Sequence, residues 1–236
     1  MLEASGGVVM PGYDATWLSR RDGLWRIVTR GQTVSASIVV NAAGAWADEV
    51  ARRADLPPLG IEARRRTVAV VSAPLGIRLD GPMTADAARN FYVRPAPSID
   101  GIELFMSPCD EAPLLPGDAQ PQAADLDLVR ARLSEVCRTE AGIAYAPVRR
   151  AWAGLRSFAP DELPVVGFDP LGEAFFWVAG QGGHRLQAAP GIAELTVTLV
   201  LGEAIGGRLL DEGVQVGPLS VRRSAHSSAR ASRVST

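Results

Sequence analysis

The stretch that most constrains the fold of this chain is FFWVAGQGGHRLQ, at residues 175–187. An apolar run of strand character stops there at a glycine-rich turn, and a helical pattern opens at Pro190. Glycines let a ligand approach the backbone, and the first amides of a helix have no partner within it, so this combination predicts a site for an anion or a polarised carbonyl. A second apolar segment that ends in small residues, VVNAAGAW at 39–46, predicts another close approach to the backbone. Two such segments suggest a large, flat cofactor.

Length and composition narrow the class of protein. The chain has 236 residues, enough for one or two domains, and its net charge of -2 gives no reason to expect nucleic acid or an anionic membrane as a partner. All 24 basic residues are arginine, which excludes a lysine Schiff base. Cys109 and Cys137 lack the spacing of metal ligands, so no metal site is expected. No signal peptide and no apolar run of membrane-spanning length occur, which predicts a cytoplasmic protein without a transmembrane segment.

Hydrophobic alternation and turn residues divide the chain into short strands and a few helices. In the first third we expect an extended segment at 7–19, a hairpin turn at 21–23, strands at 25–29 and 33–41, and a helix at 45–54. The apolar run Ile38-Val39-Val40 is typical of a strand that is buried on both faces.

A second unit is expected to begin near Ile61. Its expected elements are strands at 65–71, 90–94 and 102–106, a proline-rich loop at 112–123, and an amphipathic helix at 125–138 with Leu126, Val129, Leu133 and Val136 on its apolar face. A strand at 148–154 returns the chain to the first unit. There the helix from Pro190 to about Leu201 is apolar nearly all round and is expected to be buried. The Ser- and Arg-rich end is expected to be a disordered tail.

Five motifs together resemble one known family. They are VVNAAGAWADEVA (39–51), RRRTVAVV (64–71), NFYVRP (90–95), WAGLRSFAPDELPVVG (152–167) and FFWVAGQGGHRLQ (175–187). In this order they resemble the D-amino-acid oxidase superfamily of flavoproteins, and within it most of all the D-arginine dehydrogenases and related D-amino-acid dehydrogenases. The resemblance implies FAD as the cofactor and a small-molecule amino acid as the substrate.

The resemblance also implies a mixed α/β (α+β) fold, in which an incomplete FAD-binding Rossmann-like domain of the glutathione-reductase type is interleaved with a mixed-sheet substrate domain. The expected parts are residues 1–60 (C-terminal part of the FAD-binding domain), 61–150 (substrate-binding domain), 151–218 (return to the FAD-binding domain) and 219–236 (disordered tail). The GxGxxG turn that opens the family's FAD domain occurs nowhere in this sequence, so we expect an incomplete copy without the main anchor of the ADP half. A missing N-terminal half or an electron acceptor is the expected protein partner.

Three residues are expected to bind the substrate carboxylate by this resemblance: Arg156, Arg66 and Tyr92. Arg156 lies among apolar residues, and its planar fork can pair two carboxylate oxygens at once. Arg66 belongs to a run of three arginines, which is otherwise typical of a solvated face, and the alignment favours it over Arg64 on the same strand face. The Tyr92 hydroxyl would contact the carboxylate, although a half-buried tyrosine of a sheet has the same pattern.

The resemblance assigns the cofactor to both glycine-containing segments. The implied residues are Ala42, Ala43, Gly44 and Trp46, and then Gly182, Gly183, His184, Arg185, Leu186 and Gln187. Helix N–H groups at the second segment would stabilise the negative charge of a reduced flavin. Plain structural packing also calls for small residues at both places, and His184 has no visible partner for a catalytic triad. Arg185 stands where relatives usually have glycine, which would be costly if that position needs a positive φ.

The implied reaction is the oxidation of a D-amino acid, in which hydride passes from the α-carbon to the flavin and the imine is hydrolysed to a 2-oxo acid. Arg156, Arg66 and Tyr92 would position the substrate, and the sequence indicates no protein base. A glycine- or sarcosine-type amine oxidase is an alternative with the same chemistry. A catalytically inactive or split fragment that lacks the ADP-binding half is a second alternative.

Overall fold

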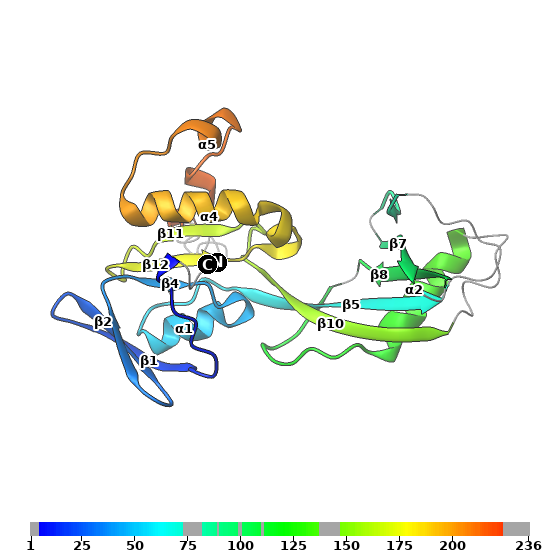
Figure 1. The fold of residues 1–236 in the computed structure, drawn as a ribbon, viewed down its shortest axis with the longest axis horizontal. Helices are drawn as coiled ribbons and strands as arrows, with labels where there is room; N and C mark the ends of the chain where they lie inside the picture. Colours follow the sequence, from blue (N-terminus) through cyan, green and yellow to red (C-terminus); the bar gives the residue numbers. More distant parts are fainter. Residues whose placement is uncertain are drawn as a thin grey trace, which may run out of the picture. The chain divides into compact units, whose positions relative to one another are not determined.

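The computed structural model describes residues 5–72, 82–88, 90–98, 101–109, 111–136 and 147–223. They form two compact units (Figure 1). The first unit comprises residues 1–62 and 157–236, and the second comprises residues 63–156. The chain leaves the first unit at the start of strand β5 (Glu62–Ser72) and returns to it near the end of strand β10 (Val148–Phe158). The fold is mixed α/β, as the sequence predicts.

An antiparallel sheet with the order β1-β2-β3 begins the first unit. Strand β1 spans Ala15–Arg21, β2 spans Leu24–Thr29 and β3 spans Thr33–Ala36. The predicted hairpin turn is confirmed, because Asp22 and Gly23 have φ values of 52° and 79°, as a two-residue turn between twisted strands requires. The predicted extended segment at 7–19 is wrong in its first part, since β2 pairs with it only from Ala15 onward.

The predicted strand at 33–41 is two strands that belong to two sheets. Strand β3 pairs with β2 and ends at Ala36, whereas β4 (Val39–Asn41) pairs in parallel with β12 (Phe175–Ala179). Together with β11 (Val165–Phe168) they form a central sheet with the order β11-β12-β4. Strand β4 is therefore an edge strand of the described sheet, and Val40 is 43% exposed rather than buried on both faces as predicted.

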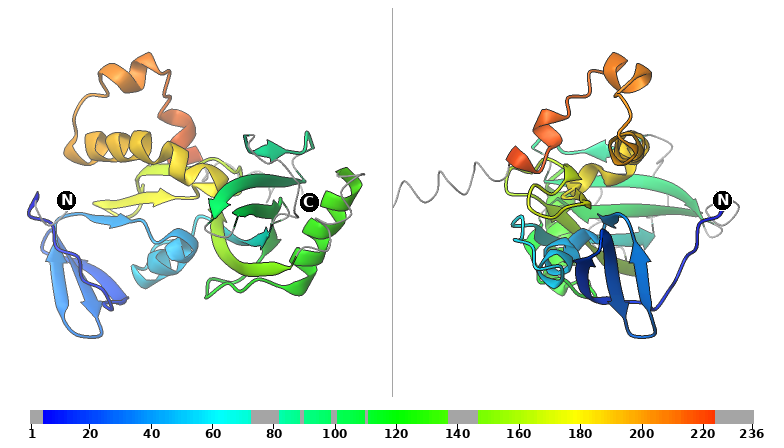
Figure 2. Two further views of the ribbon diagram at one scale, coloured as in Figure 1. Left: turned by 45° about the vertical axis from the view of Figure 1, so that its right-hand side comes forward. Right: turned by 90° about the vertical axis from the view of Figure 1, so that its left-hand side faces the viewer.

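Strand β12 builds the core of the first unit, because its side chains alternate between two layers. Phe175 and Trp177 pack with the apolar side of α1 (Ala47–Arg53), while Phe176 packs with α4 (Arg185–Leu201). Figures 1 and 2 show these two helices on opposite faces of the central sheet. All three aromatic side chains are fully buried. Burial of such a side chain contributes about 1.5–3 kcal/mol, so this alternation fixes the sheet between its helices.

The start of α4 differs from the prediction. The helix begins at Arg185, directly after the 3-10 turn η3 (Gly182–His184), and not at Pro190. Pro190 lies inside the helix, where it removes one backbone hydrogen bond without ending the helix. A proline so close to a helix start is easily taken for its first residue, which is why the sequence misplaces the boundary.

The prediction that α4 is buried all round is also wrong. Leu195 is buried, but Val197 and Leu201 are 54% and 64% exposed, because the central sheet covers one side of the helix. In the part of the chain that the structure describes, no helix is both long and apolar enough to cross a membrane.

The chain stays packed beyond the predicted start of its tail. After α5 (Gly207–Asp211) and the turn η4 (Gly217–Leu219), Val221 is buried in the main core. The Arg223 guanidinium donates to Asp161 at 2.6 Å, and this hydrogen bond lowers the pKa of Asp161 although partial burial raises it. The prediction of a tail from residue 219 is therefore wrong up to Arg223, and residues 224–236 lie outside the described residues.

The second unit contains a sheet with the order β10-β5-β8-β7-β6, and β9 pairs with β5 outside this path. Its further strands are β6 (Thr84–Ala85), β7 (Phe91–Ser98), β8 (Gly101–Pro108) and β9 (Ala112–Pro113). The strands predicted at 65–71, 90–94, 102–106 and 148–154 are confirmed as β5, β7, β8 and β10. Each is longer than predicted. Strands β7 and β8, for example, pair along their full lengths, from Phe91 opposite Pro108 to Ser98 opposite Gly101.

Helix α2 (Ala123–Val136) confirms the predicted helix at 125–138. Its residue Val129 is buried in a cluster with Leu104 and Met106 of β8. The predicted apolar positions Leu133 and Val136, and also Cys137, lie outside the described residues or side chains.

One buried carboxylate fixes the chain just before β5. Asp48 of α1 accepts hydrogen bonds from three consecutive backbone N–H groups, those of Leu59, Gly60 and Ile61, at 2.8–2.9 Å. The loop after α1 is thereby held in one conformation, which sets where β5 begins. Sequence patterns gave no sign of this contact.

Candidate active site

The three consecutive arginines of β5 do not form a solvated face. Arg65 and Arg66 are 9% and 10% exposed, and they point to opposite faces because side chains alternate along a strand. Arg65 pairs with Asp125 of α2 through two hydrogen bonds of 3.1 and 3.2 Å. Burial raises the pKa of Asp125, but the hydrogen bonds from Arg65 and Thr67 and the charge of Arg65 outweigh it and lower that pKa.

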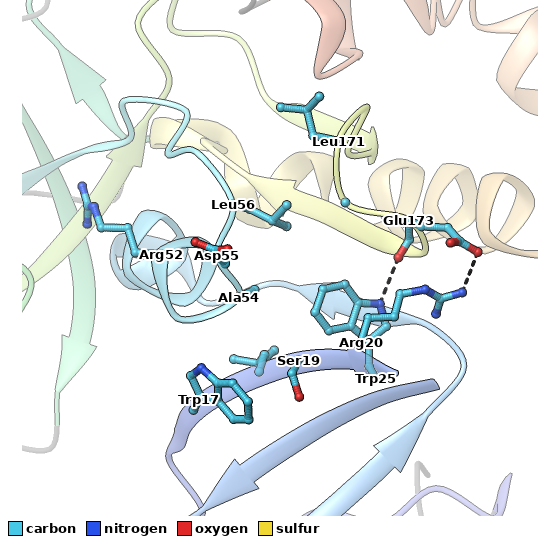
Figure 3. A pocket seen from close by; sticks show the side chains of 12 residues that line it. Trp17, Ser19, Arg20, Trp25, Arg52, Ala54, Asp55, Leu56, Leu171 and Glu173 are labelled. Atoms are coloured by element: carbon cyan, nitrogen blue, oxygen red, sulfur yellow. Dashed lines mark hydrogen bonds and ion pairs between the residues drawn. The ribbon is translucent and has the colours of Figure 1, made fainter. Parts of the chain in front are cut away.

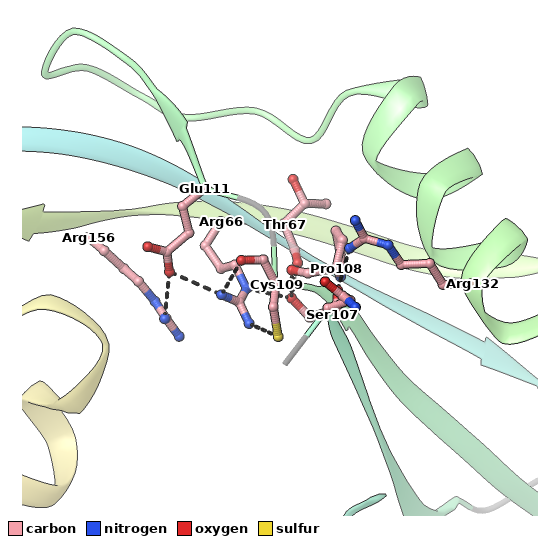
Figure 4. A network of polar contacts seen from close by, with 9 residues as sticks. Arg66, Thr67, Ser107, Pro108, Cys109, Glu111, Arg132 and Arg156 are labelled. Carbon is pink, nitrogen blue, oxygen red and sulfur yellow. Dashed lines mark hydrogen bonds and ion pairs between the residues drawn. The ribbon is translucent and has the colours of Figure 1, made fainter. Parts of the chain in front are cut away.

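Arg66 is held by hydrogen-bond acceptors on the other face (Figure 4). Its Nε donates to Ser107 Oγ at 2.8 Å, its Nη1 to Glu111 Oε1 at 3.0 Å, and its Nη2 to Cys109 Sγ at 3.0 Å. The guanidinium carbon also lies 5.8 Å from the ring centroid of Tyr92, within the range of a cation–π contact. Tyr92 in β7 lies opposite Ser107 in β8, so the sheet register brings these groups together.

Arg156, on β10, joins the same cluster through Glu111. Its Nη1 donates to Oε1 of Glu111 at 2.7 Å, and the two side chains are 28% and 15% exposed. The structure therefore gathers all three residues that were predicted to bind the substrate carboxylate, within the second unit. We call Arg66, Tyr92, Glu111 and Arg156 the arginine cluster.

Sequence reasoning missed Glu111. Strand β9 pairs with β5 so that Arg65 lies opposite Ala112, and the next step of this antiparallel register places Glu111 beside Arg66. A two-residue strand within a proline-rich loop has no periodicity to detect, so only the pairing reveals the contact.

The first predicted cofactor segment follows β4. Asn41 is buried and holds the turn from both sides: its amide donates to the Ala47 carbonyl at 2.8 Å, and its Oδ1 accepts from the N–H of Ala43 at 3.3 Å. Gly44 has a φ of +57°, which only glycine adopts at low cost, and no atom lies within 4 Å of where a Cβ would stand. Ala42 and Trp46 are exposed.

A hollow of about 590 Å³ opens beside this turn. It is lined by Ala43 and Trp46 together with Tyr13 of the N-terminal segment, Arg30 of the turn between β2 and β3, and Glu49 of α1. It lies at the carboxyl end of a parallel strand, where open α/β sheets bind their ligands. The open space over Gly44 and this hollow fit part of a flat cofactor such as the FAD that the sequence implies. The family's own pyrophosphate turn, GxGxxG, is not among these residues.

The second predicted segment is a tightly packed turn. Gly182 has a φ of +52°, and a Cβ there would lie 2.8 Å from Cε1 of Phe158. Gly180 is similarly constrained, with a φ of +64° and backbone atoms of Ala159 3.1 Å from a Cβ. Internal packing by itself therefore explains why these two positions are glycine.

The residues after this turn lie on the surface of the first unit. Gly183, His184, Arg185, Leu186 and Gln187 are all exposed. His184 Nδ1 lies 3.4 Å from Oε1 of Gln187. Arg185 has an ordinary helical φ of -48°, so the backbone cost considered for arginine at this position does not arise.

A second hollow, of about 570 Å³, lies in the first unit between the β1–β2 hairpin, the end of α1 and the turn before β12 (Figure 3). Arg20 and Glu173 form an ion pair of 2.6 Å at its side, and the hydrogen bond and charge of Arg20 lower the pKa of Glu173. None of the residues predicted for the site lines this hollow. Over the described ranges, no group of three or more His, Cys, Asp or Glu residues could hold a metal ion.

Comparison with known proteins places these observations in a family. The sequence profile of the DAO family, described as "FAD dependent oxidoreductase", matches residues 1–199. The bovine (Bos taurus) protein "FAD-dependent oxidoreductase domain-containing protein 1" is 30% identical over 182 residues, which cover 72% of this chain and 37% of that protein.

Two solved structures share the fold. Glycine oxidase from Geobacillus kaustophilus superimposes with a TM-score of 0.71 at 22% identity, over 88% of this chain and 53% of that one. L-proline dehydrogenase from P. horikoshii gives a TM-score of 0.72 at 19% identity, over 86% and 53%. The chain thus spans about half the length of these enzymes, and a little over a third of the bovine relative.

Proposed function

Because this chain belongs to the DAO family of FAD-dependent oxidoreductases, we propose that it serves in the oxidation of D-amino acids to 2-oxo acids. The observation that carries the proposal is the convergence of Arg66, Arg156 and Tyr92 in the second unit. Two guanidinium groups and a phenol in one half-buried cluster suit a substrate carboxylate.

The two arginines differ in how many of their nitrogens are bonded to the protein. Arg66 already donates from all three of its nitrogens to the protein. Among the described residues Arg156 donates through Nη1, which leaves Nε and Nη2 for a ligand. We propose that Arg156 pairs with the substrate carboxylate, that Arg66 keeps the charge and shape of the cluster, and that the Tyr92 hydroxyl donates a further hydrogen bond.

The residues proposed to hold FAD are Ala42, Ala43, Gly44 and Trp46 after β4, and Gly182 to Gln187 at the start of α4. When bound, FAD supplies the acceptor for the hydride of the substrate α-carbon. The chain's own residues bind and orient the substrate. Loss of the α-hydride, and of a proton from nitrogen to water, would leave an imine, which water hydrolyses to a 2-oxo acid and ammonia. Holding the reacting groups in place is a large part of catalysis in such a reaction.

Anaerobic reduction of the flavin tests this proposal. The protein is loaded with FAD, freed of excess by gel filtration, and mixed with D-alanine, L-alanine, D-arginine, glycine or sarcosine in the absence of oxygen. Bleaching of the flavin absorbance by D-amino acids supports the proposal. Bleaching by glycine or sarcosine alone would support the amine-oxidase alternative, and rapid return of colour in air would identify oxygen as the electron acceptor.

A second candidate function is that of one part of a two-part flavoprotein. Strand β4 forms an edge of the described central sheet, with Val40 exposed on it, and several apolar residues of α4 are exposed as well. A further strand and helix, on this polypeptide or on a separate one, would cover these surfaces and bring the GxGxxG turn. Flavin absorbance that survives gel filtration of this chain alone would count against this candidate.

A further inference from the structure

The carboxylate of Glu111 lies where two guanidinium groups converge. Its Oε1 accepts from Nη1 of Arg66 at 3.0 Å and from Nη1 of Arg156 at 2.7 Å. A glutamate shared by two arginines leaves one positive charge in excess. Since Glu111 and Arg66 are 15% and 10% exposed, water screens these charges less than it would at the surface.

Two other arginines of this sheet, Arg65 and Arg150, are paired with carboxylates outside the arginine cluster. Arg65 points to the opposite face of the strand and is paired with Asp125. On the outer part of the sheet, Arg150 is paired with Glu103 at 2.9 Å. The excess charge of the arginine cluster therefore resides on Arg156, which is the more exposed of its two arginines and retains N–H groups for a ligand.

We infer that Glu111 is a specificity-determining residue, which sets the cluster to one net positive charge and so selects substrates that carry a single carboxylate. This inference rests on the proposed function, because it assumes that the cluster binds the substrate carboxylate. A monocarboxylate neutralises the cluster. A dicarboxylate brings a second negative charge close to Glu111. Repulsion between this charge and the Glu111 carboxylate lowers the affinity of the cluster for the dicarboxylate.

Glu111 also positions Arg156. The guanidinium is fixed at one nitrogen by a carboxylate that the β9–β5 pairing holds in place. A long arginine side chain that is fixed in this way loses less conformational freedom when it binds a ligand. Loss of the Glu111 charge should therefore shift the choice toward dicarboxylates, whereas loss of the positioning contact should weaken the binding of acetate.

Calorimetric titration with acetate and malonate tests the inference without requiring catalysis. We expect the wild-type chain to prefer acetate, and Glu111→Gln to raise the malonate-to-acetate affinity ratio by about tenfold or more, as removal of a unit charge a few ångströms away implies. Glu103→Gln removes the same charge from the same sheet but pairs with the exposed Arg150, so its ratio should equal that of the wild type.

Glu111→Asp keeps the charge but shortens the side chain, so the carboxylate no longer reaches both arginines. We expect it to weaken acetate binding about threefold or more while the affinity ratio stays near the wild-type value. This variant tests the positioning role even if Glu111→Gln does not fold, because unchanged acetate binding would refute that role.

The outcomes separate the inference from the proposed function. If the wild-type chain binds neither anion, the arginine cluster is no carboxylate site, and the proposed function falls together with the inference. If the wild type binds acetate but Glu111→Gln leaves the ratio unchanged, lowers it, or shows no malonate binding, the proposed function stands and Glu111 has no part in specificity.

Discussion

Arg66 and Arg156 donate to the same oxygen atom, Oε1 of Glu111, although they come from different strands. A shared acceptor couples the two side chains, so a change at one alters the geometry of the other. The two arginines differ in their access to a ligand. Arg66 is enclosed by protein partners, whereas Arg156 is more exposed and retains N–H groups for a ligand. The first prediction follows from this difference.

Replacement of Arg156 by alanine should raise KM for a D-amino acid by about thirtyfold or more in the FAD-loaded protein, because truncation of a charged carboxylate partner typically costs 2–5 kcal/mol. Steady-state kinetics measure this effect. The matched variant is Arg150→Ala, on the same strand but 58% exposed, which should leave KM within about twofold. Kinetics of Arg156→Ala that equal those of the wild type would remove this residue from carboxylate binding.

Replacement of Gly182 by alanine should destabilise the first unit by about 1–3 kcal/mol, because the new Cβ would meet Phe158 at 2.8 Å and φ is +52°. The control is Gly191→Ala inside α4, where no atom lies within 4 Å of the new Cβ. There alanine should be neutral or stabilise by about 0.5–1 kcal/mol. Urea unfolding measures both, and equal stabilities of the two variants would show that the turn at Gly182 is not as tight as described.

Replacement of Asp48 by asparagine should destabilise the first unit by about 2–3 kcal/mol. The carboxylate accepts three backbone N–H bonds, and an amide group would turn a donor toward at least one of them. Asp55→Asn serves as the control, since Asp55 is exposed and has a φ of 58°, which asparagine tolerates well. An Asp48→Asn variant as stable as Asp55→Asn would show that these three hydrogen bonds do not stabilise the first unit.

The pair of Asp125 and Arg65 predicts a dependence of stability on pH. The pKa of Asp125 is lowered in the folded protein, so the ionised carboxylate stabilises the fold above the ordinary aspartate pKa of about 3.9, and this contribution disappears as the pH falls through the lowered value. The stability lost in Asp125→Asn should therefore be full at pH 7 and shrink below about pH 4.

Unfolding by urea at a series of pH values measures this loss. Asp127→Asn is the matched variant on the same helix, with a side chain that is 74% exposed and an ion pair of 3.7 Å to Arg130. It should change stability by no more than about 0.5 kcal/mol at any pH. A loss in Asp125→Asn that stays constant down to pH 2 would show that its charge does not stabilise the fold.

Local patterns predicted the elements whose residues alternate or turn in a recognisable way. The hairpin at Asp22-Gly23 and the strands of the second unit follow from such patterns. Turn conformation and alternating burial both depend on residues that are close together in the sequence. The boundary of α4 and the division of residues 33–41 between two sheets were misplaced. Both depend on which strand or turn lies alongside, and the neighbour is distant in the sequence.

The candidate site shows the same division. Arg66, Arg156 and Tyr92 could be named from their motifs, and their functional roles stay predictions. Glu111 could not be named, since its position beside Arg66 follows from the pairing of β9 with β5. The hydrogen bonds to Asp48 could not be predicted for a related reason. Its three partners are backbone N–H groups, which have no side-chain signature in the sequence.

The opposite orientations of Arg65 and Arg66 separate two kinds of mutational cost within one strand. A change at Arg65 disturbs the contact with α2, whereas a change at Arg66 disturbs the groups around Glu111, which we propose take part in substrate binding. Substitutions at these two adjacent codons are therefore subject to different constraints, because each side chain contacts a different set of groups.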